Sequence, residues 1–452
     1  MRELVGVEPP APVPPSPARV VVDLRPLQEP ERTPTTAAYL RSLLRAFAAD
    51  PLPGESFVPV LRLLRPDPTR EPGLEGLAVA ARRRVLPTAR FLRSAGLTVD
   101  VFQLRSAEIG SGRGREESGS AGVLYHTAGG AVPLGSAVPV VATLLDLAPW
   151  ELPSIYAASP AARFGHRLRA RILRDATRLI VCSDATAESA RRLLHVRPER
   201  IAVVPLAADE AFAPAAGRAE RVAGLRARLG LPPRYFVFTG RYDARKDLGT
   251  LFRALAALRE EAPPAPTPPR AAGRARAPAE TDAGEGARRA QAAPEPIPLP
   301  PVVVLAGAQD VPETDGPALA RAAARHRVED LVRLVPHLSQ EDLATLEAGA
   351  AAAVFPAISE GTGLAVIEAL AVGIPVVASR VGPLPGLVGP AGIIVEPRDP
   401  ERLTAALRAA WSGHIRDQLG RAARQRAKGP RRTWVDVARE TRAVYASALA
   451  GD

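Results

Sequence analysis

The sequence has very little cysteine and no long apolar runs, and each shortage excludes a class of protein. Cys182 is the single cysteine among 452 residues. Disulfide frameworks and cysteine-rich zinc sites need several cysteines at set spacings, so both are excluded, which favours a reducing, cytoplasmic compartment. The proline-rich N-terminus lacks the apolar core of a signal peptide, and no run approaches the roughly 18 apolar residues of a membrane span. We therefore expect a soluble or peripheral protein.

Lysine is nearly absent as well, although the formal net charge is +11. The arginines are spread along the whole chain and are not gathered into one basic segment, so we expect no nucleic-acid partner. This spread is typical of a general arginine preference. Only Lys246 and Lys428 escape it. We expect each to lie where an ammonium group does something that a guanidinium cannot.

Short apolar segments alternate with amphipathic helical periodicity along most of the chain. The first is residues 19–24, and later examples include residues 235–239 and 352–355. Such alternation indicates parallel sheets, so the predicted fold class is α/β. Single cores rarely grow beyond about 250 to 300 residues, so this length predicts two domains with a cleft between them. The other predicted strands are residues 138–145, 179–182, 201–205, 302–306, 332–335 and 375–378.

Two segments interrupt the alternation. Residues 109–122 contain glycine, serine and charge without periodicity, and residues 262–300 are rich in proline, alanine and arginine. Neither can bury enough apolar surface to offset the entropy cost of ordering, so we predict two disordered insertions. The sequence turns polar at residues 214–221. We place the domain boundary there, with one domain at residues 1–214 and the next at 215–432.

A glycine-containing turn joins a predicted strand to a predicted helix within residues 351–373. The helix begins near Thr362 and ends at Gly373, because apolar residues recur between them at helical spacing. A helix N-terminus offers unpaired amides and a partial positive charge, and glycines there let a phosphate approach closely. The turn is therefore a predicted anion cradle, at the strand end where open α/β sheets bind ligands. Its residues are Gly361, Thr362, Gly363 and Leu364.

Charged residues flank this cradle. Glu360 lies at its mouth and Glu368 follows eight residues later, and each carboxylate can accept two hydrogen bonds from a vicinal diol of a ribose or hexose. A second strand, residues 235–239, is followed by Gly240, Arg241 and Lys246. The two cations can stabilise a leaving diphosphate without a metal ion. Together these features predict a nucleotide-sugar site.

Other kinds of site fit the sequence less well. The segment GTGLAV contains the first two glycines of a dinucleotide-binding fingerprint, but Val366 occupies the third position. No Walker A motif or nucleophile elbow is present. The histidines do not show ligand spacing, so we predict no metal site and no cofactor. They are His126, His166, His195, His326, His337 and His414.

On these motifs the chain resembles the retaining glycosyltransferases of the GT4 family, which have the GT-B fold of two facing Rossmann-like domains. The family's two glutamates separated by seven residues correspond to Glu360 and Glu368. Its glycine, arginine and lysine correspond to Gly240, Arg241 and Lys246. The resemblance implies that Glu360 contacts the transferred sugar and Glu368 the ribose, while Arg241 and Lys246 contact the diphosphate.

The resemblance also assigns roles to the rest of the chain. It implies that Pro336, His337 and Leu338 hold the base, that residues 1–214 form the acceptor side, and that residues 433–452 form a helix returning to the N-terminal domain. The N-terminal half departs from the family pattern at two places. The segment PERTPTTAAYL contains Tyr39 but lacks the glycines that the family has in this loop. Leu145 stands before Asp146, where the family often has a histidine.

Two functional hypotheses follow. The first is a retaining, metal-independent transfer of a hexose from a GDP-mannose or UDP-glucose type donor to a hydroxyl acceptor, which builds a polysaccharide, glycolipid or small glycoside. The alternative is a catalytically weak or inactive nucleotide-sugar-binding subunit, suggested by the N-terminal departures.

A further hypothesis concerns residues 163–174, a basic stretch with apolar residues between the charges, which could rest on anionic lipid beside a lipid-linked acceptor. The other interpretation of this stretch is an ordinary helix with a solvated basic face.

Overall fold

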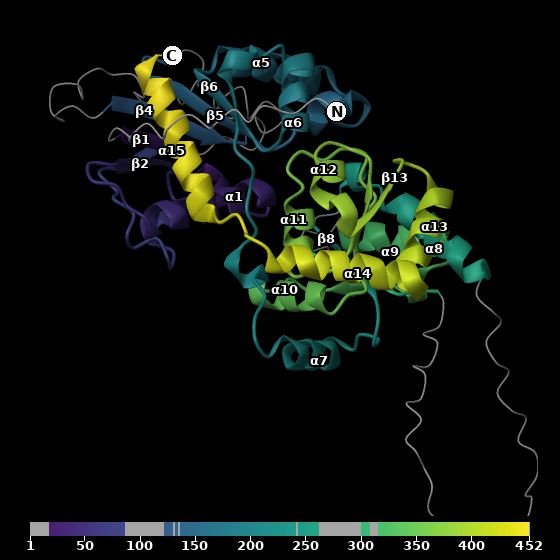
Figure 1. Cartoon of the computed structure of the whole chain (residues 1–452). Helices are drawn as coiled ribbons and strands as arrows, with labels where there is room; N and C mark the ends of the chain where they lie inside the picture. Colours follow the sequence, from purple (N-terminus) through teal and green to yellow (C-terminus); the bar gives the residue numbers. More distant parts are fainter. Residues whose placement is uncertain are drawn as a thin grey trace, which may run out of the picture.

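The computed structural model describes residues 18–85, 122–129, 132–133, 136–240, 243–261, 300–307 and 315–451. The insertions predicted at residues 109–122 and 262–300 lie outside these ranges, apart from their last residues, Gly122 and Pro300. The described chain forms two parallel sheets, each packed against helices (Figure 1), which confirms the predicted α/β class with two Rossmann-like halves. No helix in these ranges is both long and apolar enough to cross a membrane.

The N-terminal sheet has the strand order β3-β2-β1-β4-β5-β6-β7, and all its described pairings are parallel. The order reverses between β1 and β4, so the carboxyl ends of these two strands flank a switch point. Its strands are β1 (Ala18–Asp23), β2 (Ser56–Arg62), β3 (Arg83–Val85), β4 (Gly122–Ala128), β5 (Val140–Leu144), β6 (Arg178–Val181) and β7 (Ile201–Val203). Its helices include α1 (Pro34–Ala49), α3 (Ala148–Glu151), α4 (Pro153–Tyr156), α5 (Pro160–Asp175) and α6 (Asp184–Ser189).

The last helix of the chain, α15 (Trp434–Ala450), crosses back onto the N-terminal sheet, as the yellow ribbon of Figure 1 shows. Its Val437, Ala438 and Tyr445 belong to the same buried cluster as Leu40 and Phe47 of α1. A capping box at Thr433 begins the helix, because the Thr433 and Asp436 side chains each accept from the other's backbone amide. The C-terminal end of the chain therefore completes the core of the N-terminal half.

The C-terminal sheet has the order β10-β9-β8-β11-β12-β13 and is also parallel. Its switch point lies between β8 and β11, where sheets of this kind bind ligands. Its strands are β8 (Phe236–Thr239), β9 (Val303–Ala306), β10 (Val332–Val335), β11 (Ala352–Phe355), β12 (Val376–Ser379) and β13 (Gly392–Val395). Its helices are α7 (Arg218–Leu229), α8 (Leu248–Glu261), α9 (Asp315–Arg325), α10 (Gln340–Ala348), α11 (Leu364–Ala371), α12 (Leu384–Val388), α13 (Pro400–Trp411) and α14 (Gly413–Lys428).

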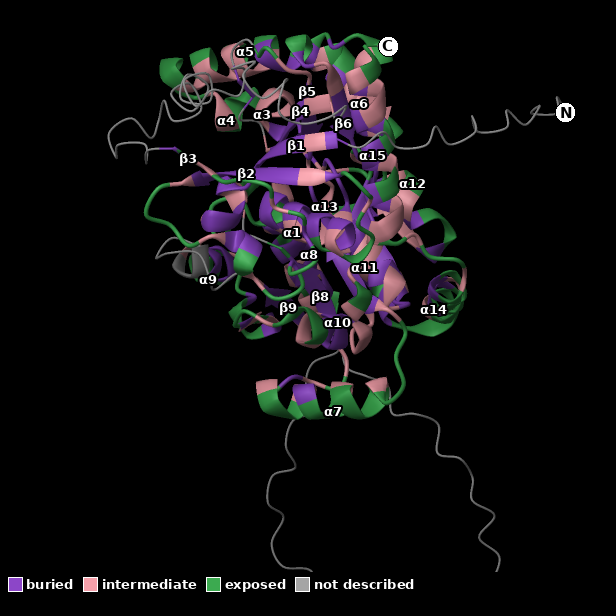
Figure 2. Cartoon of the chain, turned by 90° about the vertical axis from the view of Figure 1, so that its left-hand side faces the viewer, coloured by how far each residue is buried: buried purple, intermediate pink, exposed green. Residues whose placement is uncertain are grey.

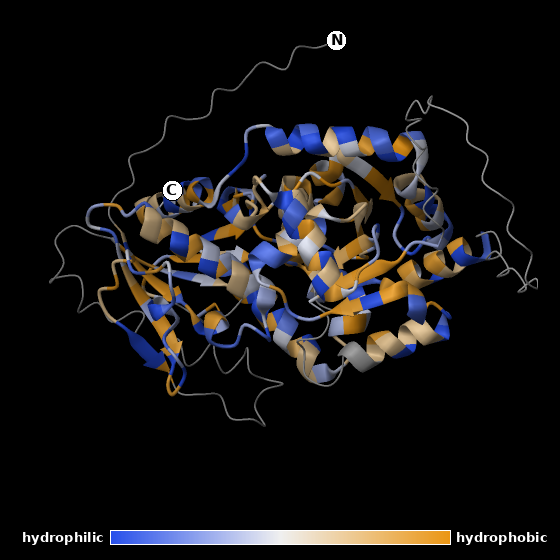
Figure 3. Ribbon diagram, turned by 90° about the horizontal axis from the view of Figure 1, so that it is seen from below, coloured by the Kyte–Doolittle hydropathy of each residue, from blue (hydrophilic) through white to orange (hydrophobic). Residues whose placement is uncertain are grey.

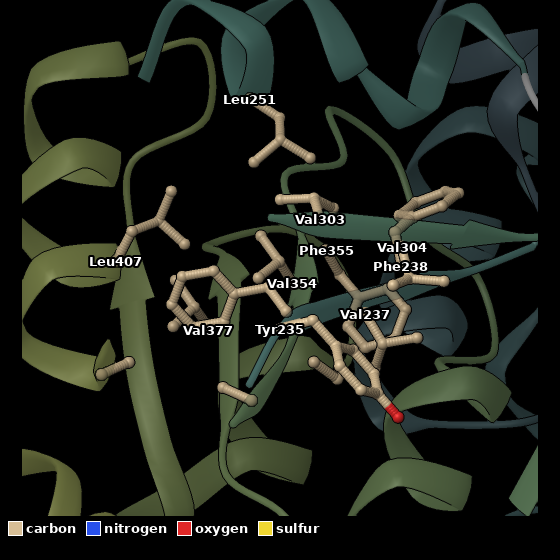
Figure 4. Close-up of a cluster of buried hydrophobic side chains, with 14 of the residues drawn as sticks. Tyr235, Val237, Phe238, Leu251, Val303, Val304, Val354, Phe355, Val377 and Leu407 are labelled. Atoms are coloured by element: carbon tan, nitrogen blue, oxygen red, sulfur yellow. The ribbon is translucent and has the colours of Figure 1, made fainter. Parts of the chain in front are cut away.

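The inner strands of both sheets are buried while the outer helices are exposed on one side (Figure 2), and most of these strands are hydrophobic (Figure 3). Figure 4 shows the C-terminal core, where Val237, Val303 and Val354 come from three neighbouring strands. Continuous apolar strands of this kind are expected where helices cover both faces of a parallel sheet. This rigid core holds the loops at the strand ends in place.

The sequence patterns did not predict every strand. β2, β3, β4 and β13 were missed. Pro59 lies inside β2, and a proline within an apolar run argues against a strand. β4 begins at Gly122, which we had assigned to an insertion. The predicted domain boundary at residues 214–221 falls on the segment that leads into α7.

Candidate donor site

Two loops meet at the switch point of the C-terminal sheet. One follows β8 and contains Gly240 and the short helix η8 (Ala244–Lys246). The other follows β11 and leads through Glu360 into α11. β8 and β11 are neighbours in the sheet, so their following loops lie side by side. These are the two loops that the sequence motifs singled out.

The turn before α11 depends on Gly363. Gly363 is the N-cap of α11 and has a φ of +65°, a left-handed conformation that favours glycine. A Cβ atom at this position would also lie 2.4 Å from Leu387 Cδ1. The Gly363 amide donates to Glu360 Oε1 at 3.3 Å, and Leu364 N donates to Thr362 Oγ1 at 3.3 Å. The turn therefore directs Glu360 back toward the helix N-terminus.

Lys246 reaches Glu360 from the other loop. Its Nζ donates to Glu360 Oε2 at 2.5 Å, and the two side chains are only 14% and 12% exposed. Burial alone would raise the pKa of Glu360, but Lys246, Arg245 and the Gly363 amide together lower it to about 2. Glu360 is therefore ionised at neutral pH. The structure thus brings together the predicted acid and the lysine that departs from the arginine preference.

Glu368 lies one turn before the end of α11. Burial, and then the charge of Asp209, raise the pKa of Glu368 to about 8. A second acid, Glu347 on α10, is completely buried, and Thr239 is the one described hydroxyl that lowers its pKa. Burial first, and then Glu368, raise the pKa of Glu347 well above its usual range. Burial therefore favours the neutral form of Glu347.

Sequence analysis missed Glu347, although a signal was present. Leu343, Leu346 and Glu347 share one face of α10 because they are three and four residues apart. A glutamate on an otherwise apolar face is unusual unless it is paired or neutral. That mismatch was the available clue.

The other predicted donor-binding residues are placed as follows. Arg241 lies outside the described residues. Gly240 directly follows β8 with a φ of +125°. Pro336, His337 and Leu338 follow β10, which is separated from β8 by β9; the first two are exposed and Leu338 is half-buried. Their predicted contacts with diphosphate and base remain predictions.

On the N-terminal side, one group of buried polar side chains on α1, β4, β5 and α15 forms its own hydrogen-bond network. The Tyr39 hydroxyl lies 3.1 Å from Thr143 Oγ1, and His126 lies between Thr143 Oγ1 and the Tyr445 hydroxyl at 2.9 and 2.7 Å. Burial lowers the pKa of His126 to about 4, so it is neutral at pH 7. Leu145 is buried in the apolar core. Among the described residues, no group of three or more His, Cys, Asp or Glu side chains could hold a metal ion.

Family models match both halves of the chain. Residues 120–212 match the model described as Glycosyltransferase Family 4, and residues 300–426 match Glycosyl transferases group 1. The second segment contains β9 to β13 and the Glu360 turn. The first contains β4 to β7 and the residues that follow them.

Curated relatives share this sequence over part of their length. A D-inositol 3-phosphate glycosyltransferase of Streptomyces bingchenggensis is 33% identical over 287 residues, which is 62% of this chain and 55% of that protein. An MMP alpha-(1->4)-mannosyltransferase of Mycolicibacterium hassiacum is 39% identical over 146 residues, 30% of this chain and 34% of that protein. The chain thus spans about half the length, or less, of the curated relatives it matches.

Solved structures share the fold. A sucrose-phosphate synthase from Thermosynechococcus elongatus superposes with a TM-score of 0.65 at 21% identity, covering 96% of this chain and 100% of that one. Anabaena HepE in complex with UDP and glucose gives a TM-score of 0.56 at 16% identity, covering 94% and 98%. At these identities the likeness shows the fold alone. Each half of the chain thus matches a glycosyltransferase family model over part of its length, and the two parallel sheets in Rossmann order have the GT-B fold of the solved glycosyltransferases.

Proposed function

We propose that the protein is a retaining glycosyltransferase that moves a hexose from a nucleotide sugar to a hydroxyl acceptor without a metal ion. The observation that carries the proposal is the Lys246–Glu360 pair at the N-terminus of α11, at the switch point of the C-terminal sheet. A buried cation beside a helix N-terminus stabilises a leaving diphosphate, and an ionised carboxylate accepts hydrogen bonds from sugar hydroxyls. Arg241 supplies a second cation in this proposal.

In the proposed reaction, the bond between the anomeric carbon and the diphosphate oxygen breaks. A new bond forms between that carbon and the acceptor oxygen on the same face of the sugar. The acceptor proton goes to the leaving phosphate, so no protein base is needed. Retention itself is supported by the family relationship.

The names of related proteins suggest the donor and acceptor classes to test. A relative is named as a mannosyltransferase, others as D-inositol 3-phosphate glycosyltransferases, and a protein of the same fold was solved with UDP-glucose. We propose a donor of the GDP-mannose or UDP-glucose type. The acceptor is a hydroxyl compound, either a small polyol or a lipid-linked sugar.

The decisive experiment is a panel of nucleotide sugars, first in thermal-shift assays and then in turnover assays with polyol and lipid-linked acceptors. Ligand binding raises the melting temperature, so the donor is identified before an acceptor is known. We expect turnover that Glu360→Gln abolishes, while Glu396→Gln, an exposed control in the same half, retains it. Tight donor binding with no hydrolysis or transfer would instead favour the inactive binding subunit, for which the apolar, buried Leu145 is the supporting observation.

The basic helix α5 supports a second, independent part of the proposal, a peripheral contact with anionic membranes. Phe164 is 60% exposed, and Ile155 on the preceding helix is 37% exposed. The exposed arginines of this helix follow one another at intervals of three or four residues, so they share a face. They are Arg163, Arg167, Arg171 and Arg174. Co-sedimentation with phosphatidylserine vesicles at low salt, lost on replacing Arg167 and Arg171 by glutamate, tests this contact; no sedimentation of the native protein would disprove it.

A further inference from the structure

Contacts from the N-terminal half end on the two donor loops, defined as residues 243–246 and residues 358–361. The Tyr156 hydroxyl at the end of α4 donates to Asp243 Oδ1 at 2.5 Å. Ser359 Oγ donates to Glu151 Oε2 of α3, also at 2.5 Å. Each donor loop is thus tied to the segment that follows β5.

Gly361 shows how closely the halves approach. Thr186 Oγ1 of α6 donates to the Gly361 carbonyl at 2.8 Å. A Cβ atom on Gly361 would lie 2.2 Å from the Leu145 carbonyl oxygen. Only glycine can occupy this position while the halves are in contact. The described conformation is therefore closed at the donor loops.

Arg245 lies at the centre of these contacts. Its amide donates to Asp243 Oδ1 at 2.9 Å, and its carbonyl accepts from Ile358 N at 2.7 Å, so its backbone joins the two donor loops. Its Nη2 lies 3.4 Å from Asp146 Oδ2 in the N-terminal half. Its Nη1 lies 4.0 Å from Glu360 Oε2. One guanidinium thus spans from the acceptor-side half to the catalytic carboxylate.

Arg245 bridges two carboxylates of like charge. Asp146 and Glu360 are both carboxylates, and they come from opposite halves, so bringing them together without a cation would be unfavourable. A guanidinium is planar and presents donors at two ends, which suits it to bridge two carboxylates. Arg245 is only 13% exposed, so solvent screens these interactions weakly. Lys246 cannot replace it, because its single ammonium is held by Glu360.

We propose that Arg245 is a positioning residue that couples contact between the two halves to the orientation of Glu360. This inference rests on the proposed function. When the N-terminal half docks, Asp146 anchors one end of the guanidinium, and the other end holds Glu360 beside Lys246. Replacing Arg245 should therefore lower the transfer rate more than it lowers the affinity for the nucleotide. Arg245 acts through contact between the halves, whereas the residues predicted to hold the nucleoside need no such contact.

A double-mutant cycle tests the coupling. We expect Arg245→Gln and Asp146→Asn each to lower kcat about tenfold. The kcat of the double variant should be no lower than that of the less active single variant, because both substitutions remove the same interaction. The Kd of the matching nucleoside diphosphate, measured by calorimetry, should change less than twofold. Arg253→Gln, an exposed arginine on α8, is the matched control. Multiplicative losses, or a Kd that rises in parallel with the loss of kcat, would overturn the proposal.

A second measurement needs no turnover. The native Cys182 is buried, and burial raises the pKa of its thiol to about 12, so it resists labelling. Spin labels at Glu199→Cys and Glu401→Cys, which are exposed positions in the two halves, report the distance between them. Arg245→Gln should shift this distribution to longer distances, and an unchanged distribution refutes the coupling. If the native protein shows no turnover, the proposed function fails, while this measurement still decides the role of Arg245.

Discussion

The carboxyl ends of the strands in the two sheets use their polar side chains differently. In the C-terminal half, Lys246 and Glu360 meet at the ligand end of the sheet. In the N-terminal half, polar groups such as the buried Asp23–Arg25 pair, at 2.7 Å, bond to each other, while Asp146 and Tyr156 contact the donor loops. We therefore propose that the C-terminal strand ends serve the reaction, while the buried polar network of the N-terminal half stabilises the fold. Variants should therefore divide into those that lower turnover and those that lower stability.

The largest expected effect is on stability. Arg442 of α15 binds both carboxylate oxygens of Glu55 at 2.9 and 2.7 Å, and both side chains are 4% exposed. Arg442→Met leaves a buried carboxylate without its cation, so we expect a loss of about 3 to 5 kcal/mol in the free energy of unfolding. Urea denaturation measures it. Arg439→Met, on the same helix but 67% exposed, should cost less than about 0.5 kcal/mol. Equal losses in both variants would contradict the assignment.

The next effect concerns turnover. Lys246→Met removes the cation from Glu360, and we expect kcat to fall about 100-fold, as when one charge-stabilising group is removed from an active site. The melting temperature should change by only a few degrees. Lys428→Met is the natural control, because it removes the other lysine of the chain at an exposed position. A similar kcat in the two variants would remove Lys246 from the site.

Glu368 gives a pH-dependent effect on stability. The folded pKa of Glu368 is about 8, above its value in the unfolded chain, so the folded state holds the proton more tightly. This contribution is fully present below about pH 4.5 and is lost as the pH rises through 8. Glu368→Gln should therefore gain about 1 to 3 kcal/mol relative to the native protein between pH 5 and 9. Melting curves at a series of pH values measure this gain. Because Glu368 also raises the pKa of Glu347, the two proteins are compared in a Glu347→Gln background, and parallel curves for them would refute the shift.

The smallest expected effect is at Tyr39. Tyr39→Phe removes one buried hydrogen bond, to Thr143, and should cost about 1 kcal/mol of stability. Turnover and the KM of the acceptor should be unchanged, because the hydroxyl is buried in the network with His126. An increased acceptor KM would instead place Tyr39 in the acceptor site. That outcome would weaken the contrast between the two halves.

The donor loops could be predicted from the sequence because they are local. Glu360, Gly361 and Gly363 fall within one short turn between a strand and a helix, and the period of the apolar residues changes there. Lys246 was recognisable because the chain has almost no other lysine. The pairing of Lys246 with Glu360 then follows from the adjacency of β8 and β11 in the sheet.

The remaining features could not be predicted for physical reasons. Arg245 and Arg442 are hidden in a chain that is rich in arginine throughout, and only tertiary contact distinguishes them from solvated neighbours. The Arg245–Asp146 contact depends on how the two halves approach, which no local pattern encodes. β4 begins directly after a polar segment, so its start could not be separated from the predicted insertion.

The return of α15 to the N-terminal sheet sets an order for folding during synthesis. The core of the first half includes Tyr445 and Val437, which are synthesised long after the last strand of that half. At about 5 to 20 residues per second, the stretch from Val203 to Trp434 takes roughly 10 to 50 seconds to make. During that time the first half exposes an apolar surface on α1 that nothing covers. Nascent chains of this protein should therefore depend on chaperones until α15 emerges.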